Sequence, residues 1–211
     1  MNGITLRSFG PADISRVRGM FCRAFELDCY SNSRFVMRHL LDHYLCSYLR
    51  EADYAIAACA NGEVTGFLLG CGKRRRGKGI YALLRAYHRL FLPFSRGGRA
   101  YLRCKRLIDQ ADESLKAAAP EADGELMLFV VRPEERSRGT GRKMLQAFRE
   151  WLAKQGAHTM QLFTDDYCDV DYYRTRGYEQ LGVRHIEFMP GRKSAFYLFS
   201  ISVERIGISG K

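Results

Sequence analysis

The chain has 211 residues, of which 46% are hydrophobic and 12% aromatic, and its formal net charge is +11. This composition is typical of a globular protein and excludes a largely disordered chain. No run of 18 apolar residues occurs, so we expect no membrane span, and the N-terminus lacks the basic and then apolar pattern of a signal peptide. We expect residues 1–211 to form one domain.

The hydrophobic pattern predicts strands and helices that alternate along the chain. The predicted strands are residues 4–9, 54–60, 64–71, 125–132, 159–164, 178–186 and 195–203. The first predicted helix begins at residues 11–13. The other predicted helices cover about residues 34–51, 80–94, 100–119, 142–155 and 169–176. Asn61-Gly62 is a strong hairpin signal, Gly97-Gly98 is expected to break the chain, and Gly177 is expected to end a helix in the left-handed conformation. This order predicts an α/β (α+β) fold, a mixed sheet with helices on both faces.

Cysteine spacing and charge indicate the compartment and the partners. The seven cysteines are scattered, odd in number and without a C-x-x-C pair, which favours reduced thiols in the cytoplasm over disulfides or a zinc site. His39 and His43 have metal-ligand spacing but no evident third ligand, so we expect no metal. Residues 72–123 hold 13 Lys or Arg and 5 Asp or Glu, a net charge of +8. Such a balance favours anionic ligands or partners.

The segment from Val131 to Gly141 is the most informative part of the chain. An apolar strand leads into the sequence Val-Arg-Pro-Glu-Glu-Arg-Ser-Arg-Gly-Thr-Gly, and an amphipathic segment, residues 144–152, follows it. A strand, a turn containing glycine and a helix start present backbone N–H groups to a phosphate. Basic side chains at positions 136, 138, 142 and 143 add positive charge there.

This spacing, Arg-x-x-Gly-x-Gly after Val-x-Pro, resembles the acetyl-CoA-binding signature of the GNAT superfamily of N-acetyltransferases. The predicted element order is similar to that of the family over residues 4–203, apart from a basic helical insert, residues 73–123, between the third and fourth strands. The resemblance implies a GNAT-like acyl-CoA N-acyltransferase fold with acetyl-CoA as cosubstrate. It implies that the diphosphate binds the turn Arg136, Ser137, Arg138, Gly139, Thr140, Gly141 and Arg142, and that the pantetheine arm lies along Phe129, Val130 and Val131.

The resemblance also implies catalytic roles. Tyr173 matches a tyrosine that protonates the departing thiolate in many members, with the neighbouring Tyr172 as the core-facing alternative. Glu125 matches the general base of some protein-acetylating members; a solvated carboxylate at the strand edge, with water as the base, is the alternative. Asp166 matches a position where an asparagine often contacts the cofactor. Because an ionised aspartate donates no hydrogen bond, Asp166 can instead cap the following helix.

The sequence therefore predicts an N-acetyltransferase in which a small-molecule or peptide amine attacks acetyl-CoA directly in a ternary complex. A longer acyl-CoA is a second enzymatic possibility. The insert has three interpretations: a helical hairpin on the sheet, a lid favouring an acidic or phosphate-bearing acceptor, or a contact with nucleic acid or an anionic membrane. In an alternative function, the fold binds CoA without turnover and the basic insert binds another macromolecule. That partner is an acidic partner or nucleic acid, and nucleic acid is the less favoured of the two. Family analogy also implies a homodimer.

Overall fold

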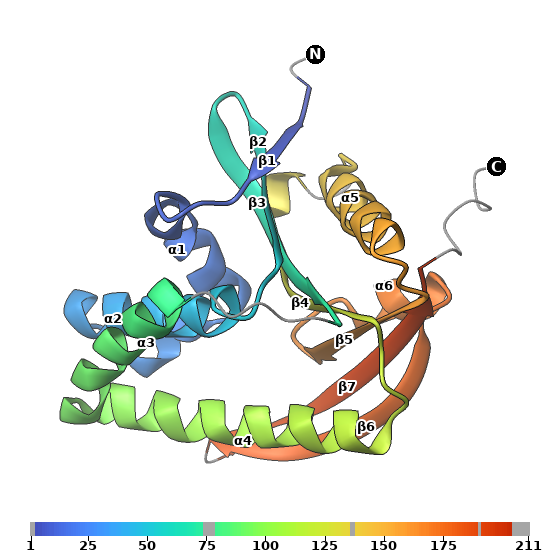
Figure 1. Ribbon diagram of the computed structural model, residues 1–211. Helices are drawn as coiled ribbons and strands as arrows, with labels where there is room; N and C mark the ends of the chain where they lie inside the picture. The colour runs from blue at the N-terminus through green and yellow to red at the C-terminus, as the bar shows by residue number, and fades with distance from the viewer. Residues whose placement is uncertain (1–2, 74–78, 136–137, 190, 204–211) are drawn as a thin grey trace.

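The computed structural model describes residues 3–73, 79–135, 138–189 and 191–203 (Figure 1). Within them, seven strands form one mixed sheet in the order β1-β2-β3-β4-β5-β7-β6. The strands are β1 Thr5–Ser8, β2 Tyr54–Ala60, β3 Glu63–Gly72, β4 Gly124–Val131, β5 Thr159–Asp165, β6 Glu179–Met189 and β7 Arg192–Ser202. The α-helices are α1 Asp13–Ala24, α2 Arg34–Leu49, α3 Gly79–Phe91, α4 Arg96–Ala118, α5 Thr140–Lys154 and α6 Val170–Thr175. Three short 3₁₀-helices are η1 Leu27–Tyr30, η2 Leu92–Phe94 and η3 Pro133–Glu135.

Local turn chemistry places the elements where the sequence predicts them. Asn61 and Gly62 have φ angles of 53° and 79° and join β2 to β3 as a tight hairpin. A two-residue turn of type I′, whose twist matches that of the hairpin strands, requires a positive φ at both central residues. Gly177 follows α6 with a φ of 78°, as expected for a left-handed helix end. The predicted mixed sheet is therefore present with its predicted strand and helix order.

One predicted break is wrong. Gly97 and Gly98 do not separate two segments but lie in the first turn of α4, whose N-terminus is capped by the Ser95 hydroxyl accepting from the Gly98 N–H at 2.9 Å. A Cβ added at Gly97 would lie 2.0 Å from the Tyr30 carbonyl oxygen, and one at Gly98 would lie 2.1 Å from that of Leu92. The glycines are needed because backbone approaches backbone here.

The helices divide between the two faces of the sheet. On one face, α1 and α2 bury Val17, Phe21 and Leu45 against Phe67 of β3. On the other face, α5 buries Phe148 in a second core (Figure 1). Between β3 and β4 the chain forms α3, which packs on α2, and the long helix α4, which runs past β6 and β7. No helix in the described segments is both long and apolar enough to cross a membrane.

Candidate active site

The centre of the sheet opens where β4 and β5 separate. These parallel strands pair only from Gly124 opposite Met160 to Leu126 opposite Leu162. On its other side β4 stays paired with β3 as far as Val131, but with a bulge at Met127, because Leu69 lies opposite Leu128 while Gly70 lies opposite Leu126. A bulge increases the local twist and bends the strand. Beyond Leu126, β4 therefore presents a backbone edge that β5 does not pair.

The strand leads from this opening into the start of α5. Gly139 has a φ of 81° and occupies the N-cap position, without a side-chain cap. Thr140 is fully buried, and its Oγ1 has no hydrogen-bond partner within the part of the chain that is described. A Cβ on Gly141 would lie 3.0 Å from Cζ of Phe129, so the glycine lets the helix start sit close against β4. The first N–H groups of a helix have no acceptor within the helix, and its dipole favours an anion there.

The side chains around this helix start fit an anionic ligand. Arg138 and Arg142 are exposed, and Arg138 forms an ion pair with Glu135 at 3.2 Å. Arg136 and Ser137, which the resemblance assigns to the same turn, lie outside the described residues. The helix start, the glycines and the buried Thr140 hydroxyl, which has no partner among the described residues, are features that favour an anion.

A small cavity of about 80 Å³ lies between the separated strands. Phe129 of β4, Thr164 of β5, Cys168 and Tyr173 are among the residues that line it. Tyr173 is 9% exposed, and its ring packs against Phe199 with 5.7 Å between ring centroids. Burial raises the pKa of Tyr173 well above its usual range, so the phenol keeps its proton and is available as a donor.

The two neighbouring tyrosines differ in burial. Tyr172, expected as the core-facing residue of the pair, is half-buried, and the Arg176 guanidinium lies 5.1 Å from its ring centroid. Tyr173 is the more buried of the two and lines the cavity. Tyr172, named as the core-facing alternative, thus only packs partly against the core, whereas α6 buries Tyr173.

Asp166 holds the end of β5 to β7. Its Oδ2 accepts a hydrogen bond from the Ala195 N–H at 2.7 Å, and its Oδ1 accepts one from the Tyr197 hydroxyl at 2.8 Å. The idea that Asp166 caps the following helix is wrong, because Asp169 caps α6 by accepting from the Tyr172 N–H at 3.0 Å. Both carboxylate oxygens of Asp166 thus accept hydrogen bonds from residues of β7.

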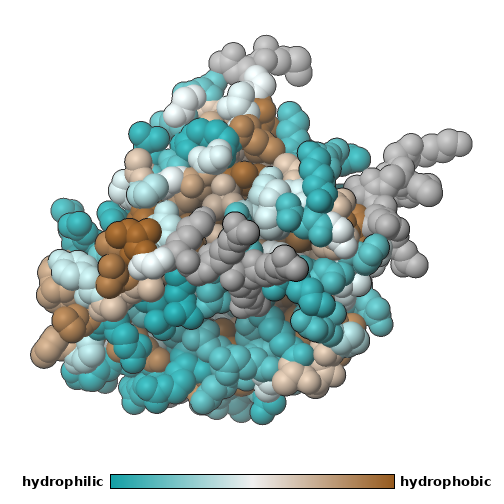
Figure 2. Space-filling model, in the orientation of Figure 1, coloured by the Kyte–Doolittle hydropathy of each residue, from teal (hydrophilic) through white to brown (hydrophobic). Residues whose placement is uncertain are grey.

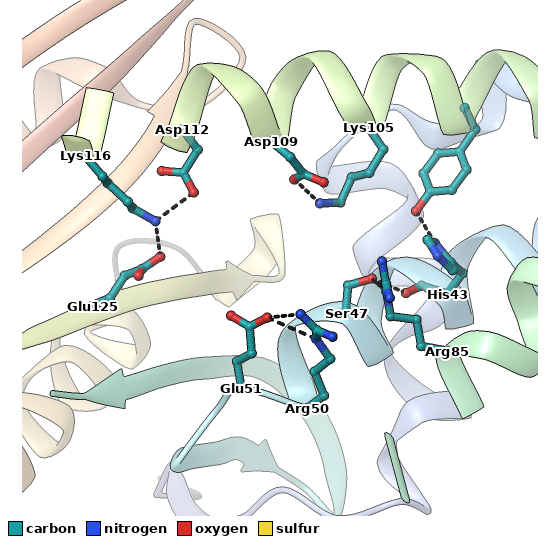
Figure 3. A network of polar contacts seen from close by, with 11 residues as sticks. His43, Ser47, Arg50, Glu51, Arg85, Lys105, Asp109, Asp112, Lys116 and Glu125 are labelled. Atoms are coloured by element: carbon teal, nitrogen blue, oxygen red, sulfur yellow. Dashed lines mark hydrogen bonds and ion pairs between the residues drawn. The ribbon is translucent and has the colours of Figure 1, made fainter. Parts of the chain in front are cut away.

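A larger polar cleft of about 570 Å³ lies between α2, α3, α4 and the start of β4 (Figure 3). Its walls carry charged side chains of both signs, from α3, α4, the start of β4 and the residues just after α2. The basic residues are Arg50, Arg85, Arg89, Lys105, Arg106 and Lys116, and the acidic residues are Glu51, Asp109, Asp112, Glu113 and Glu125. Tyr48 and Met127 line both this cleft and the small cavity, so the two spaces adjoin at the β4 bulge.

Glu125 lies at one end of the cleft in a three-residue ion-pair network. Lys116 of α4 donates to Glu125 and to Asp112, each at 2.7 Å (Figure 3). Burial lowers the pKa of Lys116, but the two carboxylates outweigh it and raise that pKa above its ordinary value. Burial raises the pKa of Asp112, with Lys116 opposing, and Asp112 Oδ1 has no hydrogen-bond partner among the described residues. The network thus contains a buried carboxylate oxygen that can accept a proton.

The other end of the cleft is formed by α2 and α3. Arg85 donates from Nε to the Ser47 hydroxyl at 3.1 Å, and that hydroxyl donates to the His43 carbonyl at 2.7 Å (Figure 3). Burial, together with the nearby Arg50 and Arg89, lowers the pKa of Arg85. Burial also lowers the pKa of His43 to about 3, so this imidazole is neutral at pH 7 and pairs with the Tyr101 hydroxyl at 2.9 Å. This end carries an excess of arginine charge.

Sequence reasoning did not identify Asp112, Lys116 and Arg85 as site residues. Asp112 and Lys116 have the i, i+4 spacing of an ordinary ion pair on a helix surface, which indicates no site by itself. His39 contacts His88 at 2.9 Å between their Nδ1 atoms, while His43 pairs with Tyr101, so the two histidines have separate partners. No cluster of three or more metal-ligating side chains occurs in the described ranges.

Comparison with known proteins agrees with this geometry. The model of the Acetyltransferase (GNAT) family matches residues 20–178, and the chain therefore belongs to the GNAT family of acetyltransferases. The expected mixed α/β fold of that family is confirmed. No significant match to a curated protein was found.

Solved structures show the same fold at low sequence identity. The GCN5-related N-acetyltransferase of Rhodopseudomonas palustris is 14% identical, with a TM-score of 0.55 over 96% of this chain and 97% of that chain. Ard1 of Thermoplasma volcanium is 15% identical, with a TM-score of 0.53 over 94% of this chain and 97% of that one. The yncA protein of Salmonella typhimurium, solved with its cofactor acetyl-CoA, is 14% identical, with a TM-score of 0.52 over 99% of both chains.

Proposed function

We propose that this protein is an acetyl-CoA-dependent N-acetyltransferase whose acceptor amine attacks directly within a ternary complex. The observation that carries the proposal is the opening between β4 and β5, which adjoins the α5 N-terminus along the strand and the polar cleft at Met127. Acetyl-CoA supplies the activated thioester when it is bound. The seven free thiols support a reducing compartment, the cytoplasm, for this activity.

The chain's own backbone provides the proposed cofactor contacts. The backbone edge of Phe129, Val130 and Val131 binds the pantetheine arm, which takes the place of an added strand. The turn at residues 136–142 binds the diphosphate through N–H groups at the start of α5. Asp166 supports this site by holding the end of β5 in place, since an ionised carboxylate cannot donate to the cofactor.

Two side chains carry out the two proton transfers of the reaction, one as base and one as acid. Glu125, directly or through water, takes the proton of the acceptor amine in the polar cleft, and the adjacent Asp112 is a second acceptor within the same network. An N–H of the exposed β4 edge donates to the carbonyl oxygen that gains negative charge. Tyr173, kept protonated by burial, gives a proton to the departing sulfur. The base and the acid thus line the two adjoining spaces on either side of the β4 bulge.

The charges of the cleft favour an acceptor that carries an anionic group as well as an amine. Glu125 and Asp112 lie at the end next to the opening, where the amine reacts (Figure 3). Arg85 and Arg89 line the α3 side of the cleft, where a carboxylate or phosphate would be bound. An amino acid, a short peptide or a phosphorylated amine has both groups.

The direct test is an acetylation assay with a panel of amines. We expect the protein to form acetylated product and CoA in equal amounts with at least one amine that carries a carboxylate or phosphate. CoA should be measured by chromatography, because accessible thiols of the protein, such as that of the exposed Cys29, would react with a thiol reagent. Tight acetyl-CoA binding without turnover on any amine would instead favour the non-catalytic CoA-binding module.

Replacing Tyr173 with phenylalanine should lower kcat about 100-fold, the usual size of a general acid contribution, while the Kd for acetyl-CoA changes little. The substitution removes one buried hydroxyl and keeps the ring that packs on Phe199. Tyr172→Phe is the matched control and should keep kcat within about twofold. Unchanged kcat in Tyr173→Phe would remove this residue from the chemistry.

Replacing Arg85 with glutamine should raise KM about tenfold for acceptors with a carboxylate or phosphate, because a charged hydrogen bond is lost. An uncharged amine should show the same KM with the variant and the wild type. Arg23→Gln, an exposed arginine on α1, removes the same charge outside the cleft and serves as the control. An equal rise of KM for charged and uncharged amines would show that Arg85 does not recognise the anionic group.

A further inference from the structure

Helix α3 carries two apolar faces, and among the described residues only one of them packs against the rest of the molecule. Tyr81 and His88 are buried against the rest of the molecule, with Leu84 partly buried beside them. The second face consists of Ile80, Leu83, Tyr87 and Leu90, which are 59%, 70%, 55% and 63% exposed, and Phe94 of η2, which is 85% exposed, continues it. We call these five residues the α3 stripe.

The spacing of the α3 stripe makes it one continuous surface. Ile80, Leu83, Tyr87 and Leu90 are separated by three and four residues in turn, which places them on one side of α3. Phe94 follows in η2. Figure 2 shows apolar side chains gathered over α3 on the face in view. Phe35, 57% exposed at the start of α2, extends the surface through its edge contact with Phe91 at 5.6 Å. A contiguous exposed patch of this kind marks an interaction site.

The charged residues that flank the stripe along the sequence are of one sign. The sequence between Glu63 and Asp109 contains twelve Lys or Arg and no Asp or Glu. Among the described residues, Arg34 and Arg38 of α2 are exposed near Phe35, and Arg99 of α4 donates to the Pro93 carbonyl next to Phe94 at 2.8 Å. If two copies of this chain paired along the stripe, these arginines would come together and their like charges would repel each other. An anionic surface complements them.

We propose that the α3 stripe docks on an anionic lipid surface. The helix lies in the plane of the interface, its apolar side chains enter the boundary of the acyl chains, and the flanking arginines bind lipid phosphates. Apolar side chains on one face with basic residues beside them are the features of helices that bind in this way. The inference rests on the α3 stripe and the arginines beside it, and it is independent of the acetyl-transfer proposal.

Vesicle co-sedimentation of the full chain tests the proposal. We expect binding to vesicles of phosphatidylcholine with about 30% phosphatidylglycerol, a fraction that gives a clearly negative surface. We also expect weaker binding at high salt and little binding to phosphatidylcholine alone. Leu83→Ser with Leu90→Ser should weaken binding at least tenfold, and Arg34→Gln with Arg38→Gln should weaken it at low salt. Val183→Ser, at a valine of β6 that is 43% exposed, is the control and should bind like the wild type.

The same proteins give the results that would overturn the proposal. The double-leucine variant changes only exposed side chains, so it should keep the wild-type melting temperature and circular dichroism. Absence of binding by the wild type, or equal binding by the double-leucine variant, would reject lipid as the occupant. A wild-type dimer in analytical ultracentrifugation that becomes a monomer in that variant would assign the stripe to a second copy instead.

Discussion

Replacing Gly141 with glutamate is expected to weaken acetyl-CoA binding at least 100-fold, measured by calorimetric titration of the purified protein. The first physical reason is space, because a Cβ at this position already lies 3.0 Å from Cζ of Phe129 and 3.6 Å from Cγ2 of Val131. The second is charge, because a carboxylate at the helix N-terminus would occupy the positive end of the α5 dipole and repel the diphosphate. A 100-fold loss corresponds to about 2.7 kcal/mol.

Two further variants separate these causes. Gly141→Ala adds only the Cβ and should cost a few-fold in affinity, since the tip of the Phe129 ring can move by a few tenths of an ångström. Gly19→Glu makes the same replacement at an exposed position of α1, where nothing lies within 4 Å of an added Cβ, and should leave affinity unchanged. Wild-type affinity in Gly141→Glu would mean that the diphosphate does not bind at the start of α5.

Replacing Glu125 with glutamine is expected to lower kcat/KM about 100-fold at neutral pH, within the usual range for a general base. Glutamine keeps the size of the side chain and an oxygen that can accept from Lys116, so the fold should be retained. What is lost is the ability to take a proton from the acceptor amine. Glu121→Gln, at an exposed glutamate outside the cleft, should behave like the wild type.

The pH dependence identifies which carboxylate takes the proton. A base acts only when it is deprotonated, so the rate falls as pH falls through its pKa. If Glu125 is the base, this acidic limb of the pH–rate profile should be lost in Glu125→Gln and kept in Asp112→Asn. Burial raises the pKa of Asp112, so a limb that survives in Glu125→Gln and disappears in Asp112→Asn would transfer the role to Asp112.

Local sequence signals predicted most of the elements because their causes are local. Asn61-Gly62 adopts the two positive φ angles of its hairpin, and Gly177 adopts the left-handed conformation that ends α6. Gly139 and Gly141 lie at the start of α5, as the turn pattern predicts. In each case a few neighbouring residues determine the backbone conformation.

The composition of the candidate site was predicted less completely. The sequence singled out Tyr173 and Glu125 through a resemblance, and the roles of both remain proposals. It did not reveal the bulge at Met127 or the separation of β4 from β5, because both result from pairing with strands distant in sequence. It also interpreted Gly97-Gly98 as a break, since the contact of Gly97 with the Tyr30 carbonyl is invisible along the chain.

What the sequence by itself determined is the order of elements, the phosphate-binding type of turn and the positive charge of residues 72–123. What only the tertiary structure decided is the meaning of that charged segment. The tertiary structure brings Lys116 of α4 onto Glu125 and Arg85 of α3 onto Ser47. Within the described part of the chain it leaves one apolar face of α3 exposed. The physical reason is that helix periodicity specifies which side chains share a face, whereas the partner of each face depends on how helices far apart in the chain pack on the sheet.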